Sequence, residues 1–192
     1  MKRHYPKLIV SIRIFLGLIF FGAGMSKLYF EHKFPGIIGP VWLEERLAEH
    51  GLGLYARFIA ASQVLAGILL LTQRFATLGA VITFPLILNI FVVTVSLEWQ
   101  GTPYVNAFLL LLNVWLLVYD YHKLKFIITD QSEELSAIRL KRKSLGADRI
   151  WFLAVLGIFL SIPLSYQNLI CAWILSALMI LLIIWNQFRK KA

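Results

Sequence analysis

Few side chains in this sequence have useful chemistry, and most of them interrupt long apolar runs. Arg13 and Asp120 are the ionisable groups expected to form a pair, because each lies near one end of such a run. Four side-chain amides on the predicted inward faces of these runs offer hydrogen-bond donors and acceptors, but a neutral amide is no proton acceptor near neutral pH. With two basic residues they make up the candidate ligand pocket: Arg13, Lys27, Gln63, Asn89, Asn106 and Asn113.

The sequence has no residue pattern typical of disulfide, metal-dependent or nucleophilic chemistry. The single cysteine, Cys171, excludes an internal disulfide and argues against thiol–disulfide cycling, which needs two cysteines. His32, His50 and the nearby glutamates have no compact metal-ligand spacing, so we expect no metal site. A glycine-rich phosphate loop, a nucleophile elbow and a zinc motif are also absent from the sequence. We therefore expect no independent catalytic activity.

Composition indicates a membrane protein. Apolar residues make up 59% of the 192 residues and charged residues only 15%, where soluble domains carry about 25%. Apolar side chains on this scale need lipid to cover them. The net charge of +9 fits basic residues on the cytoplasmic side of a membrane, so we expect no nucleic-acid partner. The predicted fold class is all-α, a polytopic membrane protein embedded in the lipid bilayer.

The lengths of the apolar runs predict six transmembrane helices. Four runs cover residues 8–26, 56–73, 75–97 and 99–119, and Gly101 and Pro103 suit a tight turn between the last two. Residues 150–188 carry no charge over 39 positions, or about 58 Å of helix, which is enough for two spans. We expect a four-helix membrane domain at 1–120, a charged cytoplasmic linker at 121–149, and a transmembrane hairpin with a basic tail at 150–192.

Each of the first four runs has small or polar residues at helical spacing, which predicts a four-helix bundle with polar groups pointing inward. Arg13 has three interpretations: an anchor that reaches the cytoplasmic headgroups, an ion pair with Asp120, or a ligand-binding group. Gln63, Asn89 and Asn106 all fall in the outer half of the predicted bundle. They either hydrogen-bond between helices or line a small polar pocket open to the outside.

The basic residues predict the orientation. With the N-terminus in the cytoplasm, 14 lysines and arginines fall inside and 4 outside. The positive-inside rule then places both termini in the cytoplasm, in the cell (inner) membrane. The outer loop at about 27–56 contains a predicted amphipathic helix from near Pro40 to Gly51, with Trp42 on its membrane face. In the inner linker, residues 132–134 are expected to open a short helix, and the basic run 141–143 to act as a topology signal with lipid contact.

The first 120 or so residues resemble the DoxX-like family. The resemblance rests on Arg13 followed by an apolar run with glycines and ending in Lys27-Leu28, on Arg74 after the second run, and on Tyr104-Val105-Asn106 opening the fourth. It implies a four-helix membrane bundle, and links some members to quinone-dependent oxidation of sulfur compounds or to membrane oxidoreductase complexes. Gln63 stands where the family commonly has Glu, which argues against proton-coupled chemistry there. The C-terminal hairpin lies outside the family pattern.

Two functions remain open from the sequence. The first is an accessory, non-catalytic subunit of a membrane-associated redox complex, with quinone as the cofactor the resemblance suggests and other complex subunits as partners. The alternative is a small transporter, or a membrane assembly or chaperone factor, with a polar intramembrane pocket.

Overall fold

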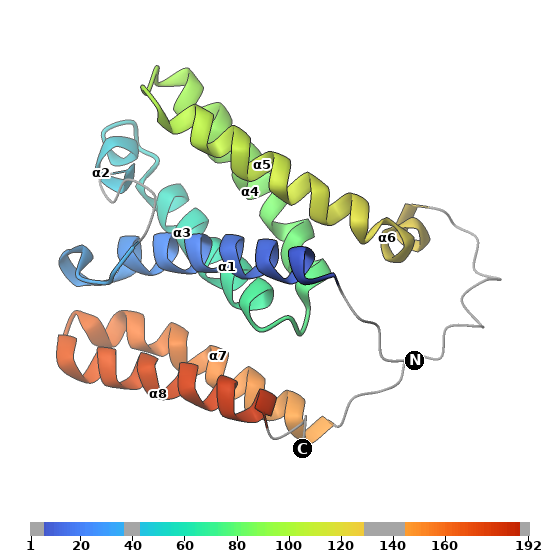
Figure 1. Ribbon diagram of the computed structural model, residues 1–192. Helices are drawn as coiled ribbons and strands as arrows, with labels where there is room; N and C mark the ends of the chain where they lie inside the picture. The colour runs from blue at the N-terminus through green and yellow to red at the C-terminus, as the bar shows by residue number, and fades with distance from the viewer. Residues whose placement is uncertain (1–5, 37–42, 129–144, 189–192) are drawn as a thin grey trace. The chain divides into compact units, whose positions relative to one another are not determined.

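The computed structural model describes residues 6–36, 43–128 and 145–188, and every regular element in these ranges is a helix (Figure 1). Six helices are long: α1 (Lys7–Leu28), α3 (Gly53–Leu71), α4 (Ala76–Ser96), α5 (Thr102–Tyr119), α7 (Leu145–Ser165) and α8 (Leu169–Phe188). Three are short: η1 (Phe30–His32), α2 (Leu43–Ala48) and α6 (Tyr121–Ile128). The chain divides into two compact units, one built on α1 to α6 and the other on η1, α7 and α8.

Five of the long helices, α1, α3, α4, α5 and α8, are apolar and long enough to cross a membrane. α7 has 21 residues, about 31 Å of helix, and its described apolar part is Arg149–Ser165. α7 lies at the start of the uncharged run 150–188, where the sequence predicts the fifth of its six spans. The fold class, an all-α polytopic membrane protein, is confirmed.

Glycines let α1 and α3 approach each other closely. A Cβ atom at Gly24 would lie 2.5 Å from the carbonyl oxygen of Ala60, and one at Gly67 would lie 2.5 Å from the backbone nitrogen of Phe21. Real Cβ atoms essentially never come so close to backbone atoms, so only glycine fits at these positions. Small residues bring helices together in lipid, where van der Waals contact and hydrogen bonds replace the hydrophobic driving force.

The first unit has one apolar core to which four helices contribute. Leu16 of α1, Leu70 of α3, Ile87 of α4 and Leu116 of α5 belong to the same cluster, and each is 0% exposed. The faces predicted from spacing turn inward on α1, α3 and α5, where Arg13, Gln63 and Asn113 are buried. On α4 the prediction is wrong, because the residues at helical spacing there, Pro85, Asn89 and Ser96, are exposed. The apolar Ile87 faces the core instead.

Left-handed residues end α3 and α4. Gln73 (φ 52°) and Glu98 (φ 53°) each follow the C-cap of a helix, and Trp99 closes the turn by donating its N–H to the carbonyl of Thr94 at 3.0 Å. Gly101 (φ 86°) then opens α5, with Pro103 in the first turn of the helix. The turn lies where the sequence predicts it.

The second unit is a helical hairpin joined by a turn at residues 166–168. The segment 28–34, expected to be part of the outer loop, belongs to this unit. The hydroxyl of Tyr29 donates to Ser161 Oγ at 2.7 Å, and the Phe30 N–H donates to Ser165 Oγ at 3.1 Å. Two serines of an almost wholly apolar helix thus bind this segment.

Residues 121–128, expected to belong to a linker, form the helix α6. The carbonyl of Asp120 accepts the N–H of Lys123 at 2.8 Å and so starts the helix. In the outer loop α2 ends at Ala48, before Gly51 (φ 73°), as the sequence predicts. The predictions at Pro40, Trp42, 132–134 and 141–143 lie outside the described residues.

Candidate functional site

Arg13 and Asp120 form a buried ion pair between α1 and the end of α5. Arg13 Nη2 lies 2.6 Å from Asp120 Oδ2, and the two side chains are 2% and 0% exposed. The other groups around the carboxylate are Thr77, which donates to Oδ2 at 2.8 Å, and Lys123, which pairs with Oδ1. Two cations and a hydroxyl therefore compensate a charge that burial alone would disfavour.

The same cluster reaches α3 and α6. Arg13 Nη1 donates to Gln73 Oε1 at 3.4 Å, while Gln73 Nε2 donates to the Leu70 carbonyl at 2.6 Å. Lys123 Nζ also donates to Thr77 Oγ1 at 3.1 Å. We call Arg13, Gln73, Thr77, Asp120 and Lys123 the inner polar cluster, because the predicted orientation places it at the cytoplasmic side.

The electrostatics keep Asp120 ionised. Burial by itself would raise the pKa of the Asp120 carboxyl, but hydrogen bonds from Lys123 and Thr77 and the charges of Arg13 and Lys123 outweigh it. The pKa therefore lies below its ordinary value. A carboxylate ionised throughout the neutral range is a structural acceptor and a poor proton donor.

Lys27 and Gln63 form a second buried contact, between α1 and α3. Lys27 Nζ donates to Gln63 Oε1 at 3.0 Å, and the two residues are 6% and 3% exposed. A buried ammonium uses one of its three donors here, on a neutral acceptor. The Lys27 ammonium is thus the least compensated charge among the candidate residues.

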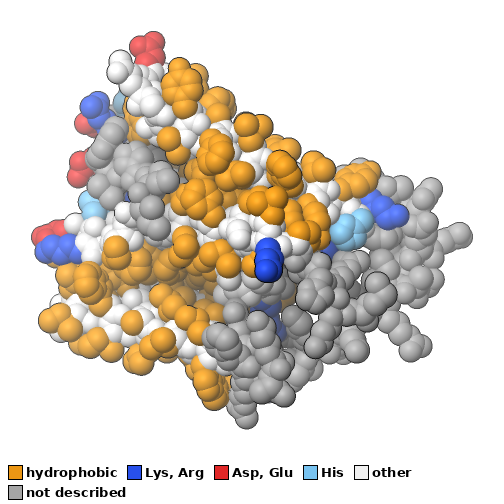
Figure 2. Space-filling view, viewed as in Figure 1, with side chains coloured by type: hydrophobic (Ala, Val, Ile, Leu, Met, Phe, Trp, Pro, Cys, Tyr) orange, Lys and Arg blue, Asp and Glu red, His pale blue; other side chains and the backbone are white. Residues whose placement is uncertain are grey.

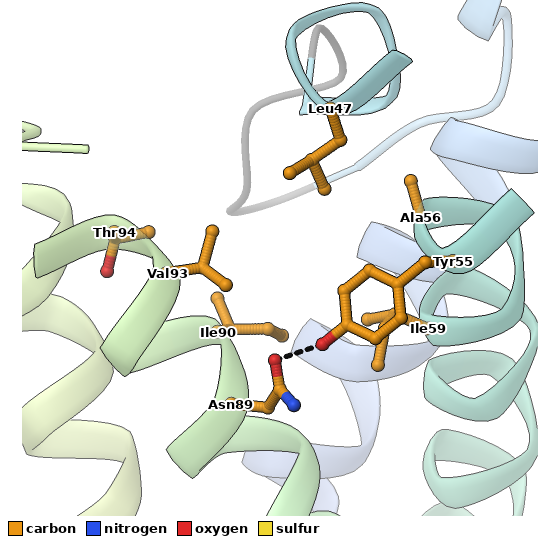
Figure 3. Close-up of a pocket in the computed structure, with 8 residues that line it drawn as sticks. All are labelled: Leu47, Tyr55, Ala56, Ile59, Asn89, Ile90, Val93 and Thr94. Carbon is orange, nitrogen blue, oxygen red and sulfur yellow. Dashed lines mark hydrogen bonds between the residues drawn. The ribbon is translucent and has the colours of Figure 1, made fainter. Parts of the chain in front are cut away.

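Asn89 lies beside a small pocket between α3 and α4 (Figure 3). Tyr55 donates its hydroxyl to Asn89 Oδ1 across this space, and Leu47 of α2 closes it from above in the view. The cavity has a volume of about 10 Å³, which is room for one water molecule at most. Its lining is otherwise mostly apolar: Leu47, Tyr55, Ala56, Ile59, Asn89, Ile90, Val93 and Thr94.

Two asparagines of α5 and its C-cap residue Asp120, spaced by seven, contact α4. Asn106 Nδ2 donates to Thr94 Oγ1 at 3.5 Å and Asn113 Nδ2 to the Ala80 carbonyl at 3.1 Å, while Asp120 accepts from Thr77. Seven residues are two helical turns, so polar contacts recur along the interface. Among the described residues, Asn113 Oδ1 has no hydrogen-bond partner although it is buried.

The predicted pocket residues are therefore distributed over separate contacts. Arg13 is paired with Asp120, Lys27 with Gln63, and Asn89 with Tyr55. Asn106 and Asn113 bind α4 instead. Of the predicted set, Asn89 alone is in the lining of the cavity of Figure 3.

The sequence predicts the central residue of most of these contacts, but not the residues that these side chains bind. Thr77, Thr94 and Tyr55 are ordinary helix residues whose sequence neighbours carry no signal. Lys123 could have been found, because it follows Asp120 by three residues, a spacing that brings side chains together on a helix. Within the described ranges no group of three or more His, Cys, Asp or Glu side chains gathers at a metal-binding distance.

Apolar side chains cover much of the described surface (Figure 2). On α5, Leu111 is 68% exposed and Val118 70% exposed, and both lie on the side away from α4. A shallow apolar groove follows this side along Leu111, Val114, Trp115, Val118 and Tyr119. In a bilayer, lipid tails cover such a face.

Comparison with known proteins supports the family resemblance. Residues 8–96 match the family model of DoxX, so this segment, from α1 to α4, is a DoxX region of a multi-pass membrane protein. The match ends before α5 and its C-cap residue, and therefore leaves out Asn106, Asn113 and Asp120. No curated protein and no solved structure matches the chain.

Proposed function

We propose that this protein is a non-catalytic subunit of a membrane-associated redox complex. The support from comparison is the DoxX region at residues 8–96, since some DoxX-like proteins are linked to membrane oxidoreductases. We also propose that it resides in the inner membrane with both termini in the cytoplasm, as its basic residues indicate.

One observation carries the proposal of a structural role: polar side chains within the spans bind one another. Arg13 binds Asp120 and Lys27 binds Gln63, each joining α1 to another helix. Asn113 joins α5 to the backbone of α4. Groups engaged in this way hold helices together in lipid, where an unsatisfied polar group costs several kcal/mol.

Quinone is the cofactor that the family resemblance suggests for the proposed complex. Lys27 and Gln63 offer hydrogen-bond donors of the kind a quinone carbonyl accepts. The cavity beside Asn89 has about 10 Å³ and holds no more than a water molecule, so this cavity does not take a quinone ring. We derive no step through quinone in this chain.

The alternative, a small transporter or assembly factor, has one observation in its favour. Lys27 is buried with a neutral acceptor, and Asn113 Oδ1 is buried with none among the described residues. A carrier that binds an anionic or donor-rich solute would use such groups.

The proposal is tested by extracting the tagged chain in lipid nanodiscs without detergent and measuring the particle that carries it. We expect protein subunits in the particle besides the 22.0 kDa chain, together with flavin, haem or iron–sulfur absorbance and quinone-reductase activity. An unrelated polytopic protein, extracted in the same way, controls for chance co-extraction. A particle that contains this chain alone, with neither absorbance nor activity, would overturn the proposal.

A further inference from the structure

The position of α6 follows from the length of α5. The 18 residues of α5 cover about 27 Å, close to the roughly 30 Å of a hydrocarbon core. Asp120 follows the last residue of α5 directly and therefore lies at the boundary between hydrocarbon and headgroups. α6 starts at the next residue, so it begins at the bilayer surface.

The joint between α5 and α6 is fixed from several sides. Asp120 ends α5 by donating its N–H to the Leu116 carbonyl at 3.0 Å, and it starts α6 by accepting from Lys123 at 2.8 Å. Its carboxylate is bound to Arg13 of α1, and Lys123 is bound to Thr77 of α4. The first turn of α6 is therefore held by three transmembrane helices.

The residues of α6 have the composition of an interfacial helix. Its sequence, YHKLKFII, has three basic residues, five apolar or aromatic ones and no acid. Lys125 is spaced by three from His122 and by four from Tyr121, so these three residues share one side of the helix. Tyr121 is 60% exposed, and tyrosine is enriched at the headgroup level of membranes.

The local charge is positive. Asp120 is matched by both Arg13 and Lys123, so the inner polar cluster carries one net positive charge before His122 and Lys125 are considered. An anion at the membrane surface would be attracted to this side of α6. The anions that are abundant at this depth are lipid phosphates.

We propose that α6 is an interfacial helix that binds the phosphate of anionic lipid headgroups through Lys125 and His122. In this arrangement Lys123 anchors the helix to α4 and α5, Lys125 supplies the charge, and the imidazole N–H of His122 donates a hydrogen bond. This site is independent of the function proposed above, because it concerns the lipid around the chain and not its partners.

Lipid binding is tested with the whole chain in mild detergent, titrated with phosphatidylglycerol and followed by native mass spectrometry. We expect binding of phosphatidylglycerol in preference to phosphatidylcholine of the same acyl length. Replacing both residues (His122→Gln with Lys125→Gln) should weaken phosphatidylglycerol binding by about five-fold or more, the effect of about 1 kcal/mol per basic residue at a membrane surface.

The chain offers a matched control in α2. Arg46 and His50 are an exposed cation and an exposed histidine, so Arg46→Gln with His50→Gln removes one cation and one histidine elsewhere in the chain. We expect this control to bind phosphatidylglycerol like the original chain. Equal loss in both double variants, or no loss in the α6 variant, would overturn the proposal. Competition by glycerol phosphate, at the concentration of lipid that saturates the site, would also overturn it, since the site would then select a soluble anion.

A second measurement does not depend on affinity. A spin label at Tyr121→Cys, in a Cys171→Ser background, reports depth through its contact with oxygen and with a water-soluble nickel complex. Cys171 is exposed and distant in sequence, so its replacement leaves α6 unchanged. In bilayer nanodiscs we expect the label at the level of the lipid phosphates. A label as accessible to nickel as one in free solution would show that α6 leaves the membrane, and would overturn the proposal.

Discussion

Arg13 and Asp120 are 107 residues apart in the sequence, yet their charged groups lie 2.6 Å apart and almost fully buried. The pair joins the first transmembrane helix to the last residue before α6, and Gln73 and Thr77 extend it to α3 and α4. The contact therefore links the DoxX region at residues 8–96 to a helix beyond it.

Removing one partner of this pair should destabilise the protein strongly. Asp120→Asn leaves the Arg13 guanidinium buried without its counter-charge, and we expect a loss of about 3–5 kcal/mol in the free energy of unfolding. Titration with a denaturing detergent, followed by circular dichroism, measures this loss. Lys123 is 26% exposed, so Lys123→Gln should destabilise by much less.

The double variant Arg13→Met with Asp120→Leu tests whether the two side chains of the ion pair act on stability as a unit. Two apolar side chains in place of a buried pair are often neutral for stability. We expect the double variant to recover most of the loss seen with Asp120→Asn. Equal destabilisation by the double and the single variant would show that the pair does not act as a unit.

The same carboxylate predicts how stability depends on pH. The pKa of Asp120 is lower in the folded protein than its ordinary value of about 3.9, because its partners outweigh burial. Its contribution is therefore present in full above about pH 4 and is lost as the pH falls through the folded-state pKa. Unfolding measured between pH 3 and 7 should show a decrease confined to the acid end, and Asp120→Asn should remove that component.

The inward faces of α1, α3 and α5 could be predicted from this sequence, but the inward face of α4 and the contacts between the helices could not. Spacing alone places Asn106, Asn113 and Asp120 on one side of α5, and the structure turns that side toward α4. Their partners are a threonine hydroxyl or a backbone carbonyl, and such groups occur on every face of a helix. Which of these groups a side chain contacts depends on the relative axial position of the two helices. The periodicity of a single helix does not define that position.

α6 was missed for a related reason. Charged residues after a span indicate a linker, and eight residues are too few for a clear helical period. The helix starts because Asp120 caps it and Lys123 is anchored by two neighbouring helices. These are tertiary contacts.

The close approach of α1 and α3 makes its glycines sensitive to substitution. Gly67→Ala would place a methyl group 2.5 Å from the Phe21 nitrogen, and the helices must separate to admit it. We expect a loss of about 1–3 kcal/mol, typical of overpacking, in the same detergent titration. Gly53→Ala is the control, since its nearest neighbour is the Ala48 Cβ at 3.5 Å, an ordinary contact. Similar losses for both variants would contradict the packing explanation.

Topology is tested with reporter fusions. The basic residues predict both termini in the cytoplasm, so a C-terminal green fluorescent protein should fluoresce and a C-terminal alkaline phosphatase should be inactive. A fusion after Gly51 should give the opposite result, because this residue lies in the predicted outer loop. Phosphatase activity at the C-terminus would refute the predicted orientation.

Variants of Lys27 and Gln63 distinguish a structural role of this pair from a role in ligand binding. Gln63→Leu leaves the Lys27 ammonium buried without its acceptor, which should cost about 1–3 kcal/mol of stability. Lys27→Met with Gln63→Leu removes both polar groups and should restore most of it, since paired polar groups can be replaced together at little cost. If the pair only holds α1 against α3, the double variant also keeps its place in the redox particle, and this is the outcome we expect. A double variant that inserts and folds with normal stability, but no longer supports function in cells lacking the original protein, would instead identify a ligand-binding lysine and favour a carrier.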